Sequence, residues 1–395
     1  MLRSLKVDQT SNNSISPISS LMMVLAGRIG VGSIAGVALA IYLGGVGSIF
    51  WMWVVALLAA SSTFAETVLG IKYHEHDHGT IYKGGPAYYI KHGLGMKRLG
   101  AFFAILVIVS YIGGFLGIQS NTIAKSFASI IPVPASLIAV IICVLTAVII
   151  FGGVEKIAAV TNKLVPIMTL VYVGTAIYIC LCHITLVPSI FLHIITEAFQ
   201  LKPFFAGFLA TFVVGIQRGI FSNEAGLGTG SIASSTTDNP DTVKNGCIQI
   251  LGIYITTLLI CTATAFIILT SDYTSLVLQD INGIEITQYA FTYHLGQLGN
   301  YIVFLSIILF SFSTILTGYY YGESCLKYFF KTINPRYLVI LKIVTLIILF
   351  LGVMLSATFL WNLVDLFVAC LAIINMIVLY KLYPIVLLEL RKWRQ

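Results

Sequence analysis

The chain has 395 residues, of which 58% are hydrophobic and only 9% are charged, and its mean hydropathy is +0.98. Because a soluble domain carries about 25% charged residues, this composition indicates a polytopic membrane protein and leaves no long polar tract for a soluble domain. The net charge of +7 is therefore a signal of membrane topology and not of nucleic-acid binding. The seven cysteines form neither a disulfide framework nor a zinc pattern.

The predicted elements begin with a polar tail, residues 1–17, which has no apolar core ahead of a cleavage site and so predicts no removable signal peptide. About ten apolar stretches of roughly 20 residues follow, each long enough to cross a bilayer. They lie near 18–42, 47–71, 100–124, 131–153, 164–182, 205–234, 246–270, 299–321, 337–357 and 359–383. Two short amphipathic pieces lie near 186–199 and 284–296. We therefore expect an all-α membrane protein with one transmembrane domain, residues 18–384, and a C-terminal tail, residues 385–395.

The orientation follows from the lysines and arginines, which are enriched in cytoplasmic segments. If the N-terminus is cytoplasmic, most of the 22 Lys and Arg residues lie inside, and the outside segments hold only Lys125 and Lys202. The sequence therefore predicts a multi-pass protein of the cell membrane with both termini in the cytoplasm.

The first span is interrupted by glycines. It reads GRIGVGSIAG at residues 27–36, and glycine weakens a helix and exposes backbone N–H and C=O groups. Irregular backbone at membrane depth is tolerated only where it is buried in protein or lines a cavity. We expect a broken helix here, with the cation Arg28 beside the break.

The loop after the second span reads HEHDH at residues 74–78. Alternating histidines on a glycine-rich polar loop favour a solvated loop over a metal site. A turn and a short interfacial helix are expected at residues 84–89.

The third and eighth spans carry polar side chains. Gln119 and Asn121 in the third should face other helices, since unpaired amides are costly in lipid. In the eighth, hydroxyls follow one face at helical spacing. They can bond to their own helix, but their density favours a hydrated or ion-binding cavity. This stripe comprises Ser306, Ser313, Thr314, Thr317, Gly318 and Tyr321.

The sixth span contains RGIFSNEAGLGTG at residues 218–230. Packing between helices explains its glycines but not its consecutive polar residues, so we expect a second broken helix with a binding role. The hexapeptide GTGSIA at 228–233 also resembles GVGSIA at 30–35. Two broken helices in corresponding halves point to a transporter built on inverted repeats. Glu66, Arg218 and Glu224 are ionisable groups inside spans, and we expect Arg218 to pair with one of the two carboxylates.

From the first span onward the chain resembles the alanine or glycine:cation symporter family. The matching motifs are GVGSIAGVALAI at 30–41, IFWMWV at 49–54, FAE at 64–66, GGP at 84–86, QSN at 119–121, RGIFSNEAGLG at 218–228, FSTIL at 312–316 and YYG at 320–322. The resemblance implies the leucine-transporter fold, with ten core helices in two inverted five-helix repeats, about 18–182 and 205–384, and with helices 1 and 6 broken at the site.

The resemblance also implies import of a zwitterionic amino acid with a cation by alternating access. The substrate carboxylate suits the free N–H groups of Val31 and Gly32 after the first break, and its ammonium suits carbonyls and Asn223 near the second. The implied substrate site comprises Val31, Gly32, Ser33, Gln119, Phe221, Asn223, Thr314 and Gly318. Sodium, the expected coupling ion, would be bound by Ala26, Ile29, Phe310, Ser313 and Thr314. We expect a monomer in the lipid bilayer, with no other cofactor.

The chain departs from the family pattern at several positions. Members usually carry an additional N-terminal helix, and Val31, Ser33 and Thr63 stand where they have Thr, Asn and Lys. Gly318 replaces a tryptophan, so we expect room for a substrate larger than alanine. Arg28 replaces a small residue: we expect it to pair with Glu66, while the alternatives are that it replaces sodium, giving sodium-independent transport or exchange, or binds an acidic substrate.

Other classes remain as alternatives. A channel would need a ring of charges or carbonyls, normally from several subunits, and an intramembrane enzyme would need a nucleophile with a base, whereas every histidine lies in a loop or near the end of a span. A non-transporting sensor of the same fold is a further alternative. Counterflow of labelled substrate in proteoliposomes separates a transporter from a channel.

Overall fold

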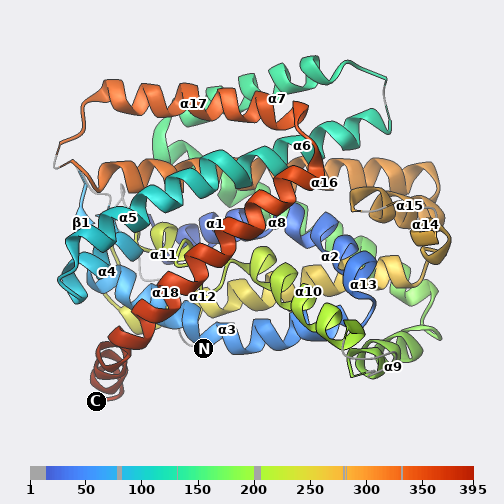
Figure 1. Cartoon of the computed structure of the whole chain (residues 1–395), viewed down its shortest axis with the longest axis horizontal. Helices are drawn as coiled ribbons and strands as arrows, with labels where there is room; N and C mark the ends of the chain where they lie inside the picture. Colours follow the sequence, from blue (N-terminus) through green and yellow to red (C-terminus); the bar gives the residue numbers. More distant parts are fainter. Residues whose placement is uncertain are drawn as a thin grey trace.

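The computed structural model describes residues 15–77, 82–130, 132–199, 206–278, 281, 283–330 and 332–395, and these residues are largely helical (Figure 1). The predicted N-terminal tail therefore lies almost wholly outside the described residues. The helices are α1 (Pro17–Arg28), α2 (Val31–Gly44), α3 (Ser48–Lys72), α4 (Pro86–Gly93), α5 (Lys97–Ile108), α6 (Leu116–Ala128), α7 (Ala135–Ile150), α8 (Gly153–Cys182), α9 (Val187–Ala198), α10 (Ala206–Asn223), α11 (Gly230–Ser234), α12 (Thr242–Ile253), α13 (Thr262–Leu269), α14 (Thr274–Leu278), α15 (Ile284–Leu295), α16 (Gln297–Lys327), α17 (Pro335–Met354) and α18 (Ala357–Arg394).

Eight helices or helix pairs among the described residues are long and apolar enough to cross a membrane. The other two predicted spans correspond to α7, which has 16 residues, and to α10 with α11, which are separated by an interruption. Large apolar side chains are exposed on α7, α8, α17 and α18, where Val148, Leu170 and Ile373 are examples. Exposed apolar surface of this extent fits contact with lipid.

The helices pack in an order that buries α1 and α16 in the middle. α1 packs against α8, α11, α12 and α16, α3 packs against α10 and α12, and α17 packs against α6 and α7. In Figure 1, α7 and α17 lie along the upper edge and α18 runs diagonally across the front. One end of the molecule carries α4, the short strands and the C-terminus, and the opposite end carries α9, α14 and α15.

Two helices contain π-helical segments, which sequence analysis did not predict. The segment η2 (Val109–Phe115) joins α5 to α6, and η3 (Tyr254–Cys261) joins α12 to α13. A π-helical segment of this kind is rare and is frequently located at a functional site.

The polar loop after α3 is more ordered than expected. Strands β1 (Glu75–His76) and β2 (Tyr82–Lys83) form an antiparallel hairpin, and α4 follows as the predicted short helix. Glu75 accepts from Lys91 at 2.7 Å, and Asp77 accepts from Lys327 at 2.9 Å. No group of His, Cys, Asp or Glu suited to a metal occurs among the described residues, and His78 lies outside them. Residues 74–77 are half-buried or exposed, as a solvated loop would be, but ion pairs also attach the hairpin to α4 and α16.

Candidate functional site

The first break lies where predicted, between α1 and α2. Ile29 and Gly30 are not helical, and α2 begins at Val31. A side chain at Gly30 would collide with the hydroxyl of Thr314 and with the amide of Gln119. Close approach of α6 and α16 therefore requires glycine at this position.

One of the free N–H groups of α2 has a partner. The side-chain oxygen of Gln119 accepts a hydrogen bond from the Val31 amide at 3.1 Å. The first amides of a helix lack partners within the helix and carry a partial positive charge. Gln119 thus accepts from the N–H group that we expected to bind the substrate carboxylate.

The second break runs from Glu224 to Thr229, between α10 and α11. Glu224, Gly226 and Gly228 have φ values of 54°, 83° and 80°, in the left-handed region that only glycine adopts without strain. Asn223 is used within the fold: its side-chain oxygen accepts from the Ala225 amide at 3.0 Å, and its nitrogen donates to Thr257 at 3.1 Å. The side chain that we predicted to bind the substrate ammonium therefore stabilises the break.

The π-helical segments support both breaks. In η2, the Tyr111 hydroxyl donates to Glu224 at 2.8 Å. In η3, Thr257 accepts from Asn223, and just beyond it Thr264 donates to the Ser33 carbonyl at 2.7 Å. Sequence analysis did not select Tyr111, Thr257 and Thr264, because the direction in which each side chain points depends on how its helix is rotated.

Four of the five residues predicted to bind sodium converge between α1 and α16. The hydroxyls of Ser313 and Thr314 lie 3.3 and 2.9 Å from the Ala26 carbonyl oxygen, and 2.9 and 3.0 Å from that of Phe310. The fifth, Ile29, lies in the break itself. Four oxygens grouped at a break are hard ligands of the kind that a sodium ion prefers.

Ser33 and Phe221, two further predicted substrate residues, lie at the contact of the broken helices. The hydroxyls of Ser33 and Ser222 are 3.3 Å apart, and the ring of Phe221 lies 2.8 Å from the position that a side-chain carbon at Gly32 would take. The structure thus places α2 directly against the end of α10.

Gly318 does not open onto free space. A side-chain carbon there would lie 2.6 Å from Leu116 and 3.3 Å from Tyr111. The expectation that the missing tryptophan leaves room is wrong for this conformation, because Leu116 of α6 fills that volume.

Arg28 is buried on the side of α1 away from the oxygen cluster. Its guanidinium donates to the Gln249 carbonyl at 3.3 Å and to Thr63 at 3.5 Å. It approaches α11 and α12 closely, so that a side chain at Gly230 or Gly252 would meet it at 2.8 or 2.9 Å. The expected ion pair with Glu66 is absent among the described residues, because Arg28 points to these helices.

The buried carboxylates bond to neutral groups. Glu66 accepts from the Gly228 amide at 3.1 Å and from Asn375 at 2.8 Å, so it connects α3 and α18 to the second break. Glu224 accepts from Tyr111 and, at 3.4 Å, from Tyr321. Hydrogen bonds of this kind lower the cost of burying a carboxylate.

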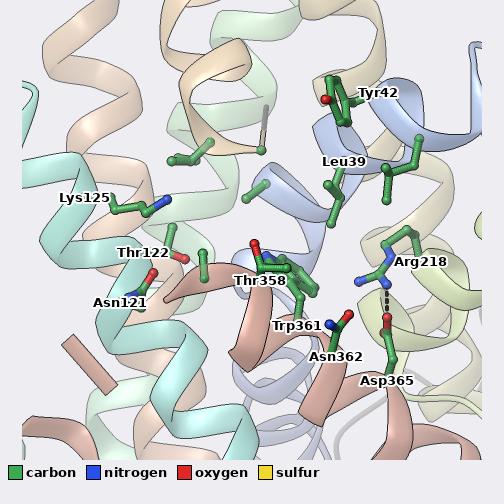
Figure 2. Close-up of a pocket in the computed structure, with 15 residues that line it drawn as sticks. Leu39, Tyr42, Asn121, Thr122, Lys125, Arg218, Thr358, Trp361, Asn362 and Asp365 are labelled. Carbon is green, nitrogen blue, oxygen red and sulfur yellow. Dashed lines mark hydrogen bonds and ion pairs between the residues drawn. The ribbon is translucent and has the colours of Figure 1, made fainter. Parts of the chain in front are cut away.

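Arg218 pairs with Asp365 of α18 (Figure 2). The predicted pairing with Glu66 or Glu224 is wrong, because both carboxylates bond elsewhere and Arg218, which lies within α10 ahead of the break, points to α18. Asp365 falls inside the predicted span 359–383, and the rule that selects ionisable residues in spans would have found it.

Two broken helices in contact, with a cluster of oxygens beside one of them, are the geometry of a membrane transporter. The model of the sodium:alanine symporter family matches residues 1–395. The chain belongs to this family, and it is a cation-coupled amino-acid transporter and not an enzyme.

Several curated relatives align along most of the chain. An amino-acid carrier protein, AlsT, of Bacillus subtilis is 38% identical over 94% of this chain and 80% of its own. The probable sodium/glutamine symporter GlnT of the same organism is 35% identical over 97% and 79%. The sodium/alanine symporter AgcS of Methanococcus maripaludis is 34% identical over 98% and 86%.

Among solved structures, the manganese transporter of Eremococcus coleocola is similar, with a TM-score of 0.60 and 15% identity over 95% of this chain and 80% of that one. At this identity the likeness shows the fold alone.

Proposed function

We propose that the protein imports a small neutral amino acid together with sodium by alternating access across the cell membrane. The observation that carries this proposal is the oxygen cluster of Ala26, Phe310, Ser313 and Thr314 beside the break of α1 and α2. Family membership and the sodium symporters among the relatives also support sodium as the coupled ion.

The arrangement that we propose is the leucine-transporter fold, a single domain of ten spans in two inverted repeats, about 18–182 and 205–384. Support comes from the two interruptions, at 29–30 and 224–229, which lie in corresponding halves of the chain. We place both termini and the hairpin in the cytoplasm, following the lysine and arginine bias, and α9, α14 and α15 outside. The transporting unit that we propose is a monomer.

The substrate carboxylate would bind the N–H groups at the start of α2, namely those of Val31 and Gly32. This requires Gln119 to release the Val31 amide, which it holds at 3.1 Å. Carbonyls freed at the second break would accept from the substrate ammonium, and Ser33 and Phe221 would line the same space. Alanine, glycine and glutamine form the first substrate panel, because relatives are named for alanine and glutamine.

Replacement of sodium by Arg28 finds no support in the geometry, because the guanidinium bonds to Gln249 and Thr63 and not to the oxygen cluster. Uptake of labelled alanine, glycine and glutamine by proteoliposomes, with an inward gradient of sodium or of choline, tests the proposal. We expect uptake only with sodium. Equal uptake in the two gradients would contradict sodium coupling, and absence of both uptake and counterflow would contradict transport.

A further inference from the structure

A cavity of about 260 Å³ lies between α2, α6, α10 and α18, toward the end that carries α15 (Figure 2). Its polar lining includes Lys125, Arg218, Thr358, Asn362 and Asp365. This lining contains two cations and one carboxylate. It therefore suits a ligand that carries both a negative and a positive group.

A thin layer of side chains separates this cavity from the two breaks. The ring of Trp361 packs edge-on against Phe221, with centroids 4.9 Å apart, and covers the guanidinium of Arg218 at 4.7 Å. Phe221 in turn lies against Gly32. A molecule in the cavity is therefore two aromatic rings away from Gly32, at the start of α2.

Arg218 has unused hydrogen-bonding capacity. Its side chain is only 3% exposed and is paired with Asp365, but its Nε and Nη1 atoms have no hydrogen-bond partner among the described residues. Buried donors without partners are costly, and a guanidinium N–H group makes a strong, charge-assisted hydrogen bond with a carboxylate oxygen. The carboxylate of Asp365 is 25% exposed and faces the same cavity.

We propose that this cavity is an external loading site for the zwitterionic amino acid, which rests on the transport function proposed above. The substrate carboxylate accepts from a free N–H group of Arg218 when Trp361 swings off the guanidinium, and the substrate ammonium pairs with Asp365. The same movement lifts Trp361 from Phe221 and opens the path to the breaks. Binding here does not require sodium, because the oxygen cluster lies beyond this layer.

The test is protection of an introduced cysteine by L-alanine. Thr358→Cys places a thiol in the cavity, and Cys182→Ser removes the exposed native thiol. A membrane-impermeant charged thiol reagent is applied to proteoliposomes in sodium-free choline buffer, with increasing alanine. Leu298→Cys, which is 63% exposed near the start of α16, is the matched control outside the cavity. Sodium-driven uptake of labelled alanine by the wild type is measured in parallel.

We expect alanine to slow labelling at position 358 but not at 298, and Arg218→Gln to raise the alanine concentration needed for protection by at least about tenfold. Asp365→Asn, which keeps the side-chain shape, should raise it several-fold and decides the matter if Arg218→Gln does not fold. Uptake by the wild type without protection, or protection unchanged in both variants, would overturn the loading site alone. Absence of sodium-driven uptake of the whole substrate panel would overturn the transport function and the loading site together.

Discussion

At the residue scale, Gln119 fills the position that we propose for the substrate carboxylate. Its side-chain oxygen accepts from the Val31 amide at the start of α2, where an anion is favoured by the helix dipole. Gln119→Glu would place a permanent carboxylate there. We expect this variant to lose alanine uptake and to lose stabilisation by alanine, measured by thermal unfolding in detergent.

Gln119→Leu is the matched control for this prediction, because it removes the amide without adding a charge. It should bind alanine better than Gln119→Glu does. Wild-type uptake by Gln119→Glu would show that the carboxylate of the substrate binds elsewhere.

The hydroxyls of Ser313 and Thr314 carry the second prediction. Each lies within 3.3 Å of the Ala26 carbonyl, so each should be a sodium ligand. Ser313→Ala and Thr314→Ala should each raise the sodium concentration for half-maximal uptake by roughly tenfold. Ser306→Ala on the same helix is the control, because this hydroxyl bonds to the Ile302 carbonyl of its own helix. An unchanged sodium response in both variants would remove the ion site from α16.

The motifs predicted both breaks and the residues near them, because glycines and consecutive polar side chains are costly in an apolar span unless the helix is interrupted there. The motifs did not predict which side chains bond to one another. The rule that selects ionisable residues in spans could have found Asp365, the partner of Arg218. The hydrogen bond between Gln119 and Val31 could not be predicted, because it depends on how α6 is rotated. Asn223 matched a motif and was given a substrate role, whereas its amide stabilises the break.

At the element scale, the contact between α6 and α16 decides what Gly318 does. Leu116 occupies the volume that a side chain at 318 would enter. Gly318→Trp should therefore destabilise the protein by roughly 1–3 kcal/mol, seen as a lower unfolding temperature in detergent. The variant should restrict uptake to alanine and glycine only if Leu116 moves and the indole can enter the site.

Leu116→Ala provides the companion to this variant. The double variant Gly318→Trp/Leu116→Ala should be more stable than Gly318→Trp alone, since the indole then has space. Wild-type stability of Gly318→Trp would mean that the two helices separate more readily than their packing indicates.

Hydropathy predicted where the spans lie but not where the helices end. The fifth span, expected at 164–182, belongs to a helix that starts at Gly153, because Glu155, Lys156 and Lys163 make its first turns polar. α18 likewise continues to Arg394 through the predicted tail. The hairpin and the π-helical segments have no periodic signal in the sequence, since tertiary contacts determine them.

At the scale of the whole molecule, the two ends differ. The cavity, with the ion pair of Arg218 and Asp365, lies toward the end that we place outside. At the hairpin end, two ion pairs connect different elements: Lys327 with Asp77 at 2.9 Å, and Lys72 with Glu389 at 2.7 Å. Alternating access requires the hairpin end to open in turn. We infer that the ion pair between α16 and the hairpin separates during each transport cycle.

Asp77→Cys with Lys327→Cys tests this inference. Joining the two thiols by a short bifunctional reagent should abolish alanine uptake, and each single cysteine variant treated with the same reagent is the control. A reagent with a reducible bond should allow uptake to return. Full uptake after complete joining would show that the hairpin and α16 move as one body.

The π-helical segments also matter for how the chain tolerates length changes. A π-helical turn contains one more residue than an α-helical turn, and each residue of an α-helix advances its side chain by about 100°. Deleting Gly113 from η2 would convert the wide turn to an α-helical turn and leave Gln119, which lies beyond it, facing Val31. Deleting Ile118, which lies between η2 and Gln119, would also leave an apolar helix of nearly the same length, but it would turn Gln119 by about 100° away from Val31, because no wide turn absorbs the loss. A one-residue gap at this position would therefore pass a hydropathy test while removing the cap of α2, so the spacing from η2 to Gln119 is as much a part of the site as the side chain itself.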